Sequence, residues 1–352
     1  MVTIGILATA ASIWSTVWPI LAAIAIFLFF ILIHELGHFL AAKLMGVRVN
    51  EFSIGFGPKM FSFGKGETKY SVRWLPLGGY CAMEGEDDDS EDNKAFGKKP
   101  VWRRIIITVA GALFNILLGF IIVVIMTAAT PVIGTTTVAQ FNEDAVSPSY
   151  GLMEGDKIIS VNGSRVFVTD DITYYAASSA DGNVQMQVKR DGEVIDLDIQ
   201  FGAENGYPAL DFKVARAEKN IGTVISYSFW DSISMMRMIY SSIGGMLTGQ
   251  YGLDDMAGPV GMVQQVSQAA AYGLDTFLWI AALITINLGI FNLLPIPGLD
   301  GGRLLFLIIE GIARRPVPKK YEAYIHLAGL ALLLVLSVVL IFHDFFRIFT
   351  GG

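Results

Sequence analysis

The stretch that decides the fold is WPILAAIAIFLFFILIHELGHFLAA, residues 18–42. It places two histidines and a glutamate inside an apolar run that exceeds the roughly 20 residues needed to cross a bilayer core. Ionisable side chains inside such a run are costly unless a partner or a metal satisfies them. The stretch therefore predicts a membrane helix that carries a polar site.

His34-Glu35-Leu36-Gly37-His38 within this stretch is an H-E-x-x-H motif. Positions i and i+4 of a helix share one face, so both imidazoles can point at one metal ion. Zinc accepts imidazole nitrogens and keeps one position open in catalytic sites. Glu35 can pass a proton from metal-bound water to a leaving amine. A polar pair that holds two helices together is the alternative reading of the histidines.

Two imidazoles leave zinc short of a third protein ligand, which has to lie at membrane depth on another helix. Asp300 meets this requirement, because it follows the third apolar run in NLLPIPGLDGG, residues 292–302, and is the only acid there. Pro295 and Pro297 should break the helix and free backbone groups, which then have to line protein or a water-filled cavity. Capping of the next helix is the alternative role of Asp300, but it does not account for the prolines and glycines. We expect His34, His38 and Asp300 to bind Zn²⁺.

The composition is that of a membrane protein. Of 352 residues, 53% are hydrophobic and 16% charged, against about 25% charged in average soluble domains. Four apolar runs have the length of membrane spans: about 18–42, 105–130, 274–294 and 324–342. The net charge of −7 argues against nucleic-acid binding. The single cysteine, Cys81, excludes an intrachain disulfide and a cysteine metal cluster.

The distribution of cations predicts the orientation in the membrane. Lysines and arginines concentrate in the loop between the first two runs and in the loop between the last two. Loops rich in these residues stay in the cytoplasm, whereas long segments translocate largely regardless of charge. We therefore expect both termini and the long 131–273 segment to be extracytoplasmic.

Residues 45–104 contain short β-rich runs at 47–56, 60–63 and 69–74, separated by glycines that mark turns. β-Hairpins are the natural prediction, and hairpins beside an intramembrane site could offer a strand edge to an extended peptide. A plug that packs at the cytoplasmic surface is an equally good reading. The acidic run 84–92 is typical of a solvated loop.

Residues 131–218 have the composition of a small α+β domain. The segment Gly151–Gly163, GLMEGDKIISVNG, resembles the corresponding stretch of a PDZ domain, with turns at Gly155-Asp156 and Asn162-Gly163 around a short strand. Such a domain could bind peptides or act as a steric gate. Apolar residues at helical spacing between 229 and 240 predict an amphipathic interfacial helix, with a core helix of the extracytoplasmic part as the alternative.

Taken together, the motifs resemble the site-2 protease family of intramembrane zinc metalloproteases, and its bacterial branch that cleaves anti-sigma factors in regulated intramembrane proteolysis. The resemblance rests on the HELGH motif, on Leu299-Asp300-Gly301, and on three further motifs in the same order: GFGP at 55–58, PLGGY at 76–80 and GPVG at 258–261. It implies that His34, His38 and Asp300 bind zinc and that Glu35 is the catalytic acid/base. It also implies that Asn287 and Asn292 hold the substrate backbone. Some members of the family have two PDZ domains, whereas this chain has room for one.

The expected fold is a polytopic α-helical membrane protein of about four transmembrane helices, with a membrane-associated β-hairpin region and one extracytoplasmic PDZ-like α+β domain. The expected domains are 1–44, 45–104, 105–130, 131–218, 219–273 and 274–352. The expected function is hydrolysis of peptide bonds in transmembrane segments, in a bacterial cell membrane. The partners would be the lipid bilayer and single-span membrane proteins trimmed first by another protease. A PDZ-bearing membrane scaffold and a metal transporter are the alternatives.

Overall fold

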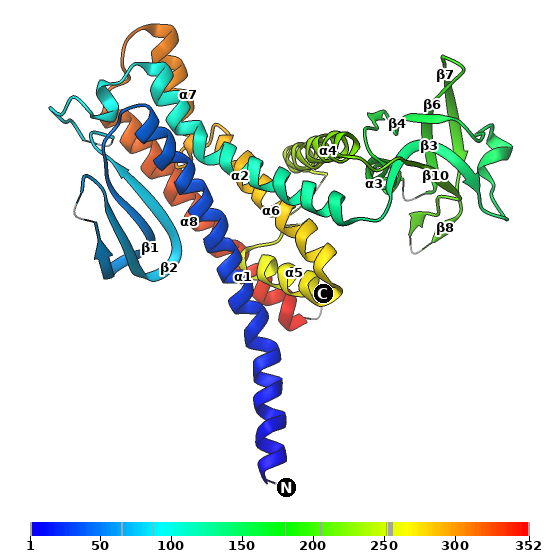
Figure 1. The fold of residues 1–352 in the computed structure, drawn as a ribbon, viewed down its shortest axis with the longest axis horizontal. Helices are drawn as coiled ribbons and strands as arrows, with labels where there is room; N and C mark the ends of the chain where they lie inside the picture. Colours follow the sequence, from blue (N-terminus) through cyan, green and yellow to red (C-terminus); the bar gives the residue numbers. More distant parts are fainter. Residues whose placement is uncertain are drawn as a thin grey trace. The chain divides into compact units, whose positions relative to one another are not determined.

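The computed structural model describes residues 2–64, 66–86, 88–179, 181–204, 206–250, 252 and 256–350. The chain divides into two compact units, one formed by residues 1–122 and 240–352 and the other by residues 123–239. Both boundaries between the units fall inside helices. Figure 1 shows the elements of each unit.

Four helices are long and apolar enough to cross a membrane: α1 (Val2–Leu44), α2 (Val101–Ala129), α6 (Leu274–Leu293) and α8 (Lys319–Thr350). The qualifying parts are Ile20–Leu44, Val101–Ala129, Leu274–Leu293 and Lys319–Arg347. These ranges contain the four predicted runs to within one or two residues at each end. The prediction of four spans is confirmed, and the chain is a multi-pass membrane protein.

The region after α1 is a sheet of two long, bent strands, β1 (Val49–Phe63) and β2 (Lys69–Met83). Residues 51–54 pair on one side with 69–72 and on the other with 79–82, while 59–63 pair with 70–73. The two strands thus form four segments in the spatial order 59–63, 69–73, 49–54, 79–83. The predicted hairpins are present, and the last segment, which ends β2, lies at the edge of the sheet.

The interior of this small sheet is partly polar. The Glu51 carboxylate accepts hydrogen bonds from Ser71 (2.6 Å) and from Arg73 (2.9 Å). Burial alone would raise the pKa of Glu51, but the hydrogen bonds from Ser71, Arg73 and Tyr80 outweigh it and lower the pKa to about 2. Glu51 is therefore ionised at neutral pH and ties three of the four segments together.

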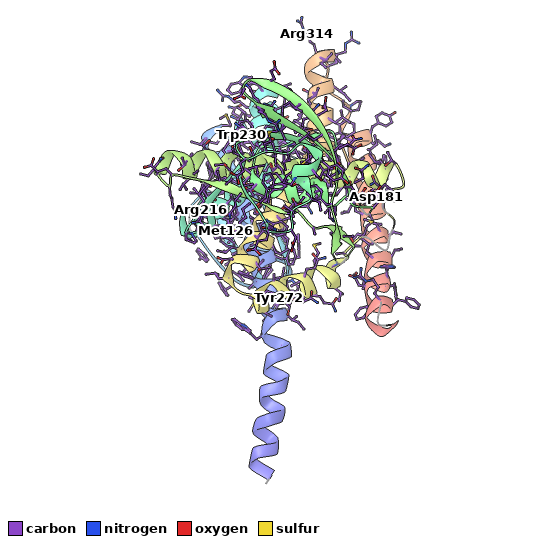
Figure 2. The ribbon with its side chains drawn as sticks, turned by 90° about the vertical axis from the view of Figure 1, so that its right-hand side faces the viewer. Met126, Asp181, Arg216, Trp230, Tyr272 and Arg314 are labelled. Atoms are coloured by element: carbon purple, nitrogen blue, oxygen red, sulfur yellow. The ribbon has the colours of Figure 1, made fainter. Side chains whose placement is uncertain are left out.

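Two shorter helices complete this unit: α5 (Pro259–Tyr272) and α7 (Asp300–Ala313). Helix α6 ends at Leu293, just before Pro295, and irregular backbone follows to Leu299. Helix α7 ends at Ala313, and the next residue, Arg314, has a left-handed backbone (φ 53°) and lies at the turn towards α8 (Figure 2). The break in the third span occurs where the prolines predicted it, and a further helix that we had not predicted follows it.

The acidic run 84–92 differs from the solvated loop that we expected. Glu86 forms an ion pair with Arg303 of α7, and the backbone oxygen of Asp88 accepts a hydrogen bond from Lys319 at the start of α8. Asp92 pairs with Arg48 at 2.7 Å. Part of the run thus pairs with the cations Arg303 and Lys319, and composition alone does not reveal this pairing.

The second unit contains an antiparallel sheet with the strand order β10-β3-β4-β6-β7, with β5 beside β4. Its elements are β3 (Ile133–Phe141), β4 (Lys157–Val161), β5 (Ser164–Arg165), α3 (Thr169–Ala176), β6 (Asn183–Arg190), β7 (Glu193–Gln200) and β10 (Phe212–Ala217). Two short strands, β8 (Ala203–Glu204) and β9 (Tyr207–Pro208), pair with each other. Apolar residues from the sheet and from α3 form its core, with Ile158, Val184, Met186 and Ile199 fully buried.

Helix α4 (Ile221–Leu247) packs against this domain through its residues up to Ile239. Trp230, labelled in Figure 2, stacks on Phe167 with ring centroids 4.6 Å apart. Arg237 donates a hydrogen bond to the backbone oxygen of Arg165, and Ser234 donates one to Asp171. One face of α4 therefore belongs to the folded domain.

Candidate metal centre

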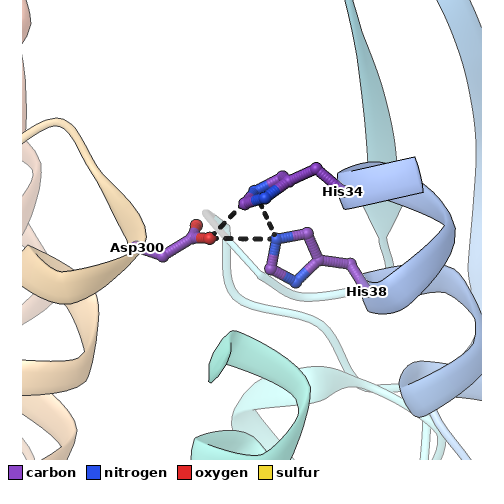
Figure 3. A group of neighbouring side chains, drawn as sticks. All are labelled: His34, His38 and Asp300. Carbon is purple, nitrogen blue, oxygen red and sulfur yellow. Dashed lines mark hydrogen bonds and ion pairs between the residues drawn. The ribbon is translucent and has the colours of Figure 1, made fainter. Parts of the chain in front are cut away.

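The centre of the first unit is a convergence of three side chains from two helices (Figure 3). His34 and His38 lie one turn apart on α1, and Asp300 is the first residue of α7. One carboxylate oxygen of Asp300, Oδ2, lies 3.1 Å from Nε2 of each histidine, and the two Nε2 atoms are 3.2 Å apart. Among the described residues, this is the group of histidines and acids that can hold a metal ion.

The donor set and its spacing fit zinc. Tetrahedral zinc with ligand bonds of about 2.0–2.1 Å needs neighbouring ligand atoms roughly 3.3–3.4 Å apart. The three atoms here lie 3.1–3.2 Å apart, so a zinc ion can be held with only small adjustments. Two imidazoles and one carboxylate leave a fourth position open, as in catalytic zinc sites.

Each histidine has an outer partner that controls which ring nitrogen carries the proton. Nδ1 of His38 lies 2.8 Å from the backbone oxygen of Ile107 on α2 and donates to it, which leaves Nε2 free to bind metal. Nδ1 of His34 lies 3.4 Å from the side-chain amide of Asn115, also on α2. Both imidazoles therefore have a partner for Nδ1 on the same neighbouring helix.

The sequence analysis did not single out Asn115 within the second apolar run, 105–130. Its side chain is fully buried, and its Oδ1 has no hydrogen-bond partner among the described residues. Turning the amide by 180° places this oxygen at Nδ1–H of His34, which satisfies both groups and leaves Nε2 for the metal. An amide at mid-span was the available signal, because a buried polar side chain in a membrane helix needs a partner.

Two glycines let α1 and α2 approach at the metal centre. A Cβ on Gly37 would lie 2.5 Å from the backbone oxygen of Ala110, and a Cβ on Gly111 would lie 2.4 Å from Nε2 of His38. Both distances are too short for real atoms. Gly37 therefore lets the backbone of α2 come close, and Gly111 is required because α2 passes directly behind the Nε2 atoms of the two histidines.

Asp300 is brought into place by the break between α6 and α7. A Cβ on Gly301 would lie 2.0 Å from the backbone oxygen of Leu294, so the first turn of α7 packs directly on the end of α6. His326 of α8 accepts a hydrogen bond (3.0 Å) from the backbone N–H of Gly298, which has φ +94°. The segment before Asp300 is thus fixed by close packing on one side and by a histidine on the other.

Glu35 lies between the histidines and the end of β2. Its side chain is half-buried, close to the backbone amide of Cys81. A Cβ on Gly79 would lie 3.5 Å from Cγ of Glu35. The edge segment of the sheet, 79–83, therefore runs past the carboxylate that the motif predicted as acid/base.

The two asparagines expected to hold substrate differ in their surroundings. Asn292 is at the end of α6, and its side-chain amide donates to the backbone oxygen of Leu288 at 2.9 Å. Asn287 is half-buried one and a half turns earlier and makes no side-chain hydrogen bond to any described part of the chain. The Asn287 amide is free to bind another backbone, whereas Asn292 would have to exchange a bond within its own helix.

The chain matches known proteins over almost its whole length. Residues 22–336 match the model of peptidase family M50. CPE1693 of Clostridium perfringens (strain 13 / Type A), whose name describes a zinc metalloprotease, is 34% identical over 328 residues, covering 92% of this chain and 98% of that protein. The "regulator of sigma-W protease RasP" of Bacillus subtilis (strain 168) is 30% identical over 421 residues, covering 94% and 99%.

A second RasP, the "zinc metalloprotease RasP" of Bacillus licheniformis, is also 30% identical, over 94% of this chain and 99% of that protein. The alignments with the two RasP proteins are longer than this chain, so both carry residues that it lacks. The family match begins within the first membrane helix, ends within the fourth, and includes both the HELGH motif and Asp300. The chain therefore belongs to peptidase family M50, the site-2 protease family, and is an intramembrane zinc metalloprotease.

Proposed function

We propose that His34, His38 and Asp300 hold the zinc ion of this protease and that Glu35 is its catalytic acid/base. The support is that three ligand atoms from residues up to 266 positions apart lie within 3.2 Å of one another. The Glu35 carboxylate lies next to this triangle and is not itself part of it. Zinc, when bound, supplies a Lewis acid that polarises the scissile carbonyl and activates water. Glu35 takes the proton of that water and gives it to the leaving amine.

The substrate has to be extended before it can be cut. A transmembrane helix hides its carbonyls in hydrogen bonds between residues i and i−4, so the scissile peptide must unwind. The edge segment 79–83 offers a place for the unwound strand, because it pairs with 49–54 on one side only and passes Glu35. Pairing with this edge would satisfy the freed backbone groups of the substrate.

Asn287 and Asn292 are proposed to hold the other side of the unwound substrate. Both lie on the last two turns of α6, the helix that leads to Asp300. An amide side chain offers both a donor and an acceptor, which matches the paired needs of a peptide group. The unbonded amide of Asn287 is the stronger candidate of the two.

Water is proposed to reach the centre from the polar side of the break. A pocket of about 360 Å³ lies between the break, α7 and α8, and Gly298, Arg303, Glu322 and His326 are among its lining residues. Gly298 is two residues before Asp300, so a cavity that is lined partly by charged side chains comes close to the proposed third ligand. Such a cavity suits the irregular backbone of the break, which needs protein or water as its partner.

The β domain is proposed to be a PDZ-like domain on the extracytoplasmic side, together with both termini, of a bacterial cell membrane. Five of its strands form one antiparallel sheet beside α3, and Asn162, at the predicted Asn-Gly turn, has the left-handed backbone (φ 48°) that the turn requires. We propose that the chain divides into the same functional segments that the sequence predicts. These are the helix with HELGH (1–44), the hairpins (45–104), the second span (105–130), the PDZ-like domain (131–218), the amphipathic segment (219–273) and the last two spans (274–352).

The substrates are proposed to be single-span membrane proteins that another protease has trimmed first. One relative is named a regulator of sigma-W protease, and cleavage of anti-sigma factors or of signal-peptide remnants would both fit this chain. The PDZ-like domain would then act as a size filter or as a substrate reader. No contact in the described residues favours a scaffold or a metal transporter, since neither function needs Glu35 beside the ligand triangle.

The test compares the purified wild type with Glu35→Gln in zinc content and in cleavage of a model single-span substrate. We expect about one zinc per chain in both proteins and cleavage that falls by about 10²–10⁴-fold in the variant. His38→Ala serves as the matched variant that should lose zinc as well as cleavage. Normal cleavage by Glu35→Gln would overturn the assigned roles.

A further inference from the structure

An apolar pocket adjoins the proposed catalytic residue in the first unit. It has a volume of about 330 Å³ and lies between α1, the end of β2 and α5. This volume is in the lower part of the roughly 300–1,000 Å³ range of small-ligand pockets and suits one large apolar side chain. Ile24, Leu28 and Ile31 line it from α1, Gly78 from β2, and Met262 and Val263 from α5.

The α1 wall of the pocket continues the helix face that carries Glu35. Ile24, Leu28, Ile31 and Glu35 are spaced by four, three and four residues, which places them on one stripe of a helix. With a rise of about 1.5 Å per residue, Ile31 is only about 6 Å along the axis from Glu35. The pocket is therefore a direct extension of the proposed catalytic site along α1.

The β2 wall links the pocket to the strand edge. Gly78 lines the pocket, and the next residue, Gly79, lies beside Glu35. A strand that pairs with the 79–83 edge projects alternate side chains to opposite faces, so one residue near the scissile bond would point towards α1 and α5. Neither glycine has a side chain that could fill the pocket, and the Phe56 ring packs where a Cβ on Gly78 would lie.

The α5 wall is held in place by a buried carboxylate of α8. Asp344 is 4% exposed, and its two oxygens accept hydrogen bonds from the backbone N–H groups of Gly258 (3.1 Å) and Gly261 (2.8 Å). A Cβ on Gly258 would lie 2.5 Å from Oδ2 of Asp344, so this cap requires glycine. The GPVG motif thus fixes the start of α5, and with it Met262 and Val263.

We propose that this pocket is a specificity subsite that receives a large apolar side chain of the substrate next to the scissile bond. This proposal rests on the proposed function of Glu35 and of the strand edge. The occupant is a substrate side chain because the pocket shares its walls with the stripe that ends in Glu35 and with the edge that would bind the substrate. A lipid acyl chain is the competing occupant, and the test separates the two.

The test measures kcat/KM for a purified single-span substrate whose residues on both sides of the mapped cleavage bond are replaced in turn by Ala, Leu and Phe. For the wild type we expect a preference of at least about tenfold for Leu or Phe over Ala at one position only. Val263→Trp fills the pocket, so the preference at that position should reverse towards Ala. Met262→Ala enlarges it, so the preference should shift towards Phe.

Gln264→Trp is the matched control, because Gln264 is the next residue on α5 and is exposed. It should keep the wild-type profile, and all variants should keep the zinc content of the wild type. Equal kcat/KM of the wild type for the Ala, Leu and Phe substrates would overturn the proposed subsite. So would a Val263→Trp variant that lowers kcat/KM by the same factor for every substrate. The proposal would also fail if the change in kcat/KM caused by Val263→Trp depended on the chain length of the lipid and not on the substrate residue. That result would identify a lipid acyl chain as the occupant.

The outcomes also separate this proposal from the one on which it rests. If Glu35→Gln cleaves as well as the wild type, the roles assigned to the metal centre fail. If Glu35→Gln is inactive and the wild type cleaves without a side-chain preference that Val263→Trp changes, only the subsite fails.

Discussion

The sheet of β1 and β2 and the large sheet of the second unit are stabilised in opposite ways. The β domain of the second unit has its own core, in which residues such as Ile158, Val184 and Ile199 are fully buried. The sheet of β1 and β2 leaves large apolar side chains exposed, with Phe61, Phe63 and Trp74 each more than half accessible. Its buried contacts come largely from α1 and α2, in a cluster that includes Ala41, Val49, Cys81 and Ile107.

This difference separates a self-sufficient domain from a sheet that depends on its helices. Because helices α1 and α2 hold the sheet of β1 and β2 in place, its edge segment 79–83 can remain unpaired on one side beside Glu35. A domain with a complete core can change without moving the helices that carry His34, His38 and Asp300. The comparison therefore predicts that damage to the second unit spares the metal centre and that small changes in helix packing destroy it.

The largest expected effect comes from a single methyl group behind the metal centre. In Gly111→Ala, the new Cβ would fall 2.4 Å from Nε2 of His38, so the ligand nitrogens must move and zinc should be lost. Zinc content by mass spectrometry checks this. Gly311→Ala on α7 is the matched control, since its Cβ meets nothing closer than 3.6 Å, and equal zinc loss in both variants would contradict the steric account.

Ile158→Ala tests the other side of the comparison. Removing this fully buried side chain from the β domain should cost about 2–5 kcal/mol of the free energy of unfolding of that domain. Limited proteolysis of the full chain should show cuts within 131–218, while zinc content and cleavage of a substrate with a short ectodomain stay unchanged. Loss of zinc in Ile158→Ala would show that the two units are coupled.

A change of intermediate size concerns the partner of His34. Asn115→Leu removes the amide at Nδ1 of His34 and should weaken zinc binding by about 10–100-fold. Competition with a chelator measures the affinity. Asn287→Leu is the matched change on α6: it should slow cleavage at unchanged zinc affinity, and a drop in affinity there would contradict its proposed contact with substrate.

The smallest effect is a pH dependence of the second unit. Burial, together with the negative charges of Asp170 and Asp171, raises the pKa of Asp231 to about 7. The folded domain therefore prefers the protonated acid, and its stability should fall as the pH rises from about 4 to 7. Asp231→Asn should raise the free energy of unfolding at pH 8 by roughly 1–3 kcal/mol and change it little at pH 4. Thermal unfolding of the wild type and the variant at both pH values measures this. An equal effect at pH 4 and pH 8 would contradict the prediction.

The sequence by itself determined the elements and the chemistry of this protein. The apolar runs predicted the four spans because length and hydropathy are local properties, and the glycines of 55–79 predicted turns between short strands. The HELGH motif needs only the helical repeat to bring His34 and His38 together, and the prolines at 295 and 297 predicted the end of α6. Asp300 could be selected as third ligand because acids are rare at membrane depth.

The tertiary structure alone decided what surrounds these residues. Asn115 behind His34, the clearance at Gly111, the cap of α5 by Asp344 and the pairing of Glu86 with Arg303 all join residues that are far apart in the chain. The spatial order of the four hairpin segments, which leaves 79–83 at the edge, is likewise a matter of register. Periodicity reports which face of an element is apolar, but the identity of its partner depends on how helices and strands pack, and no local pattern encodes that.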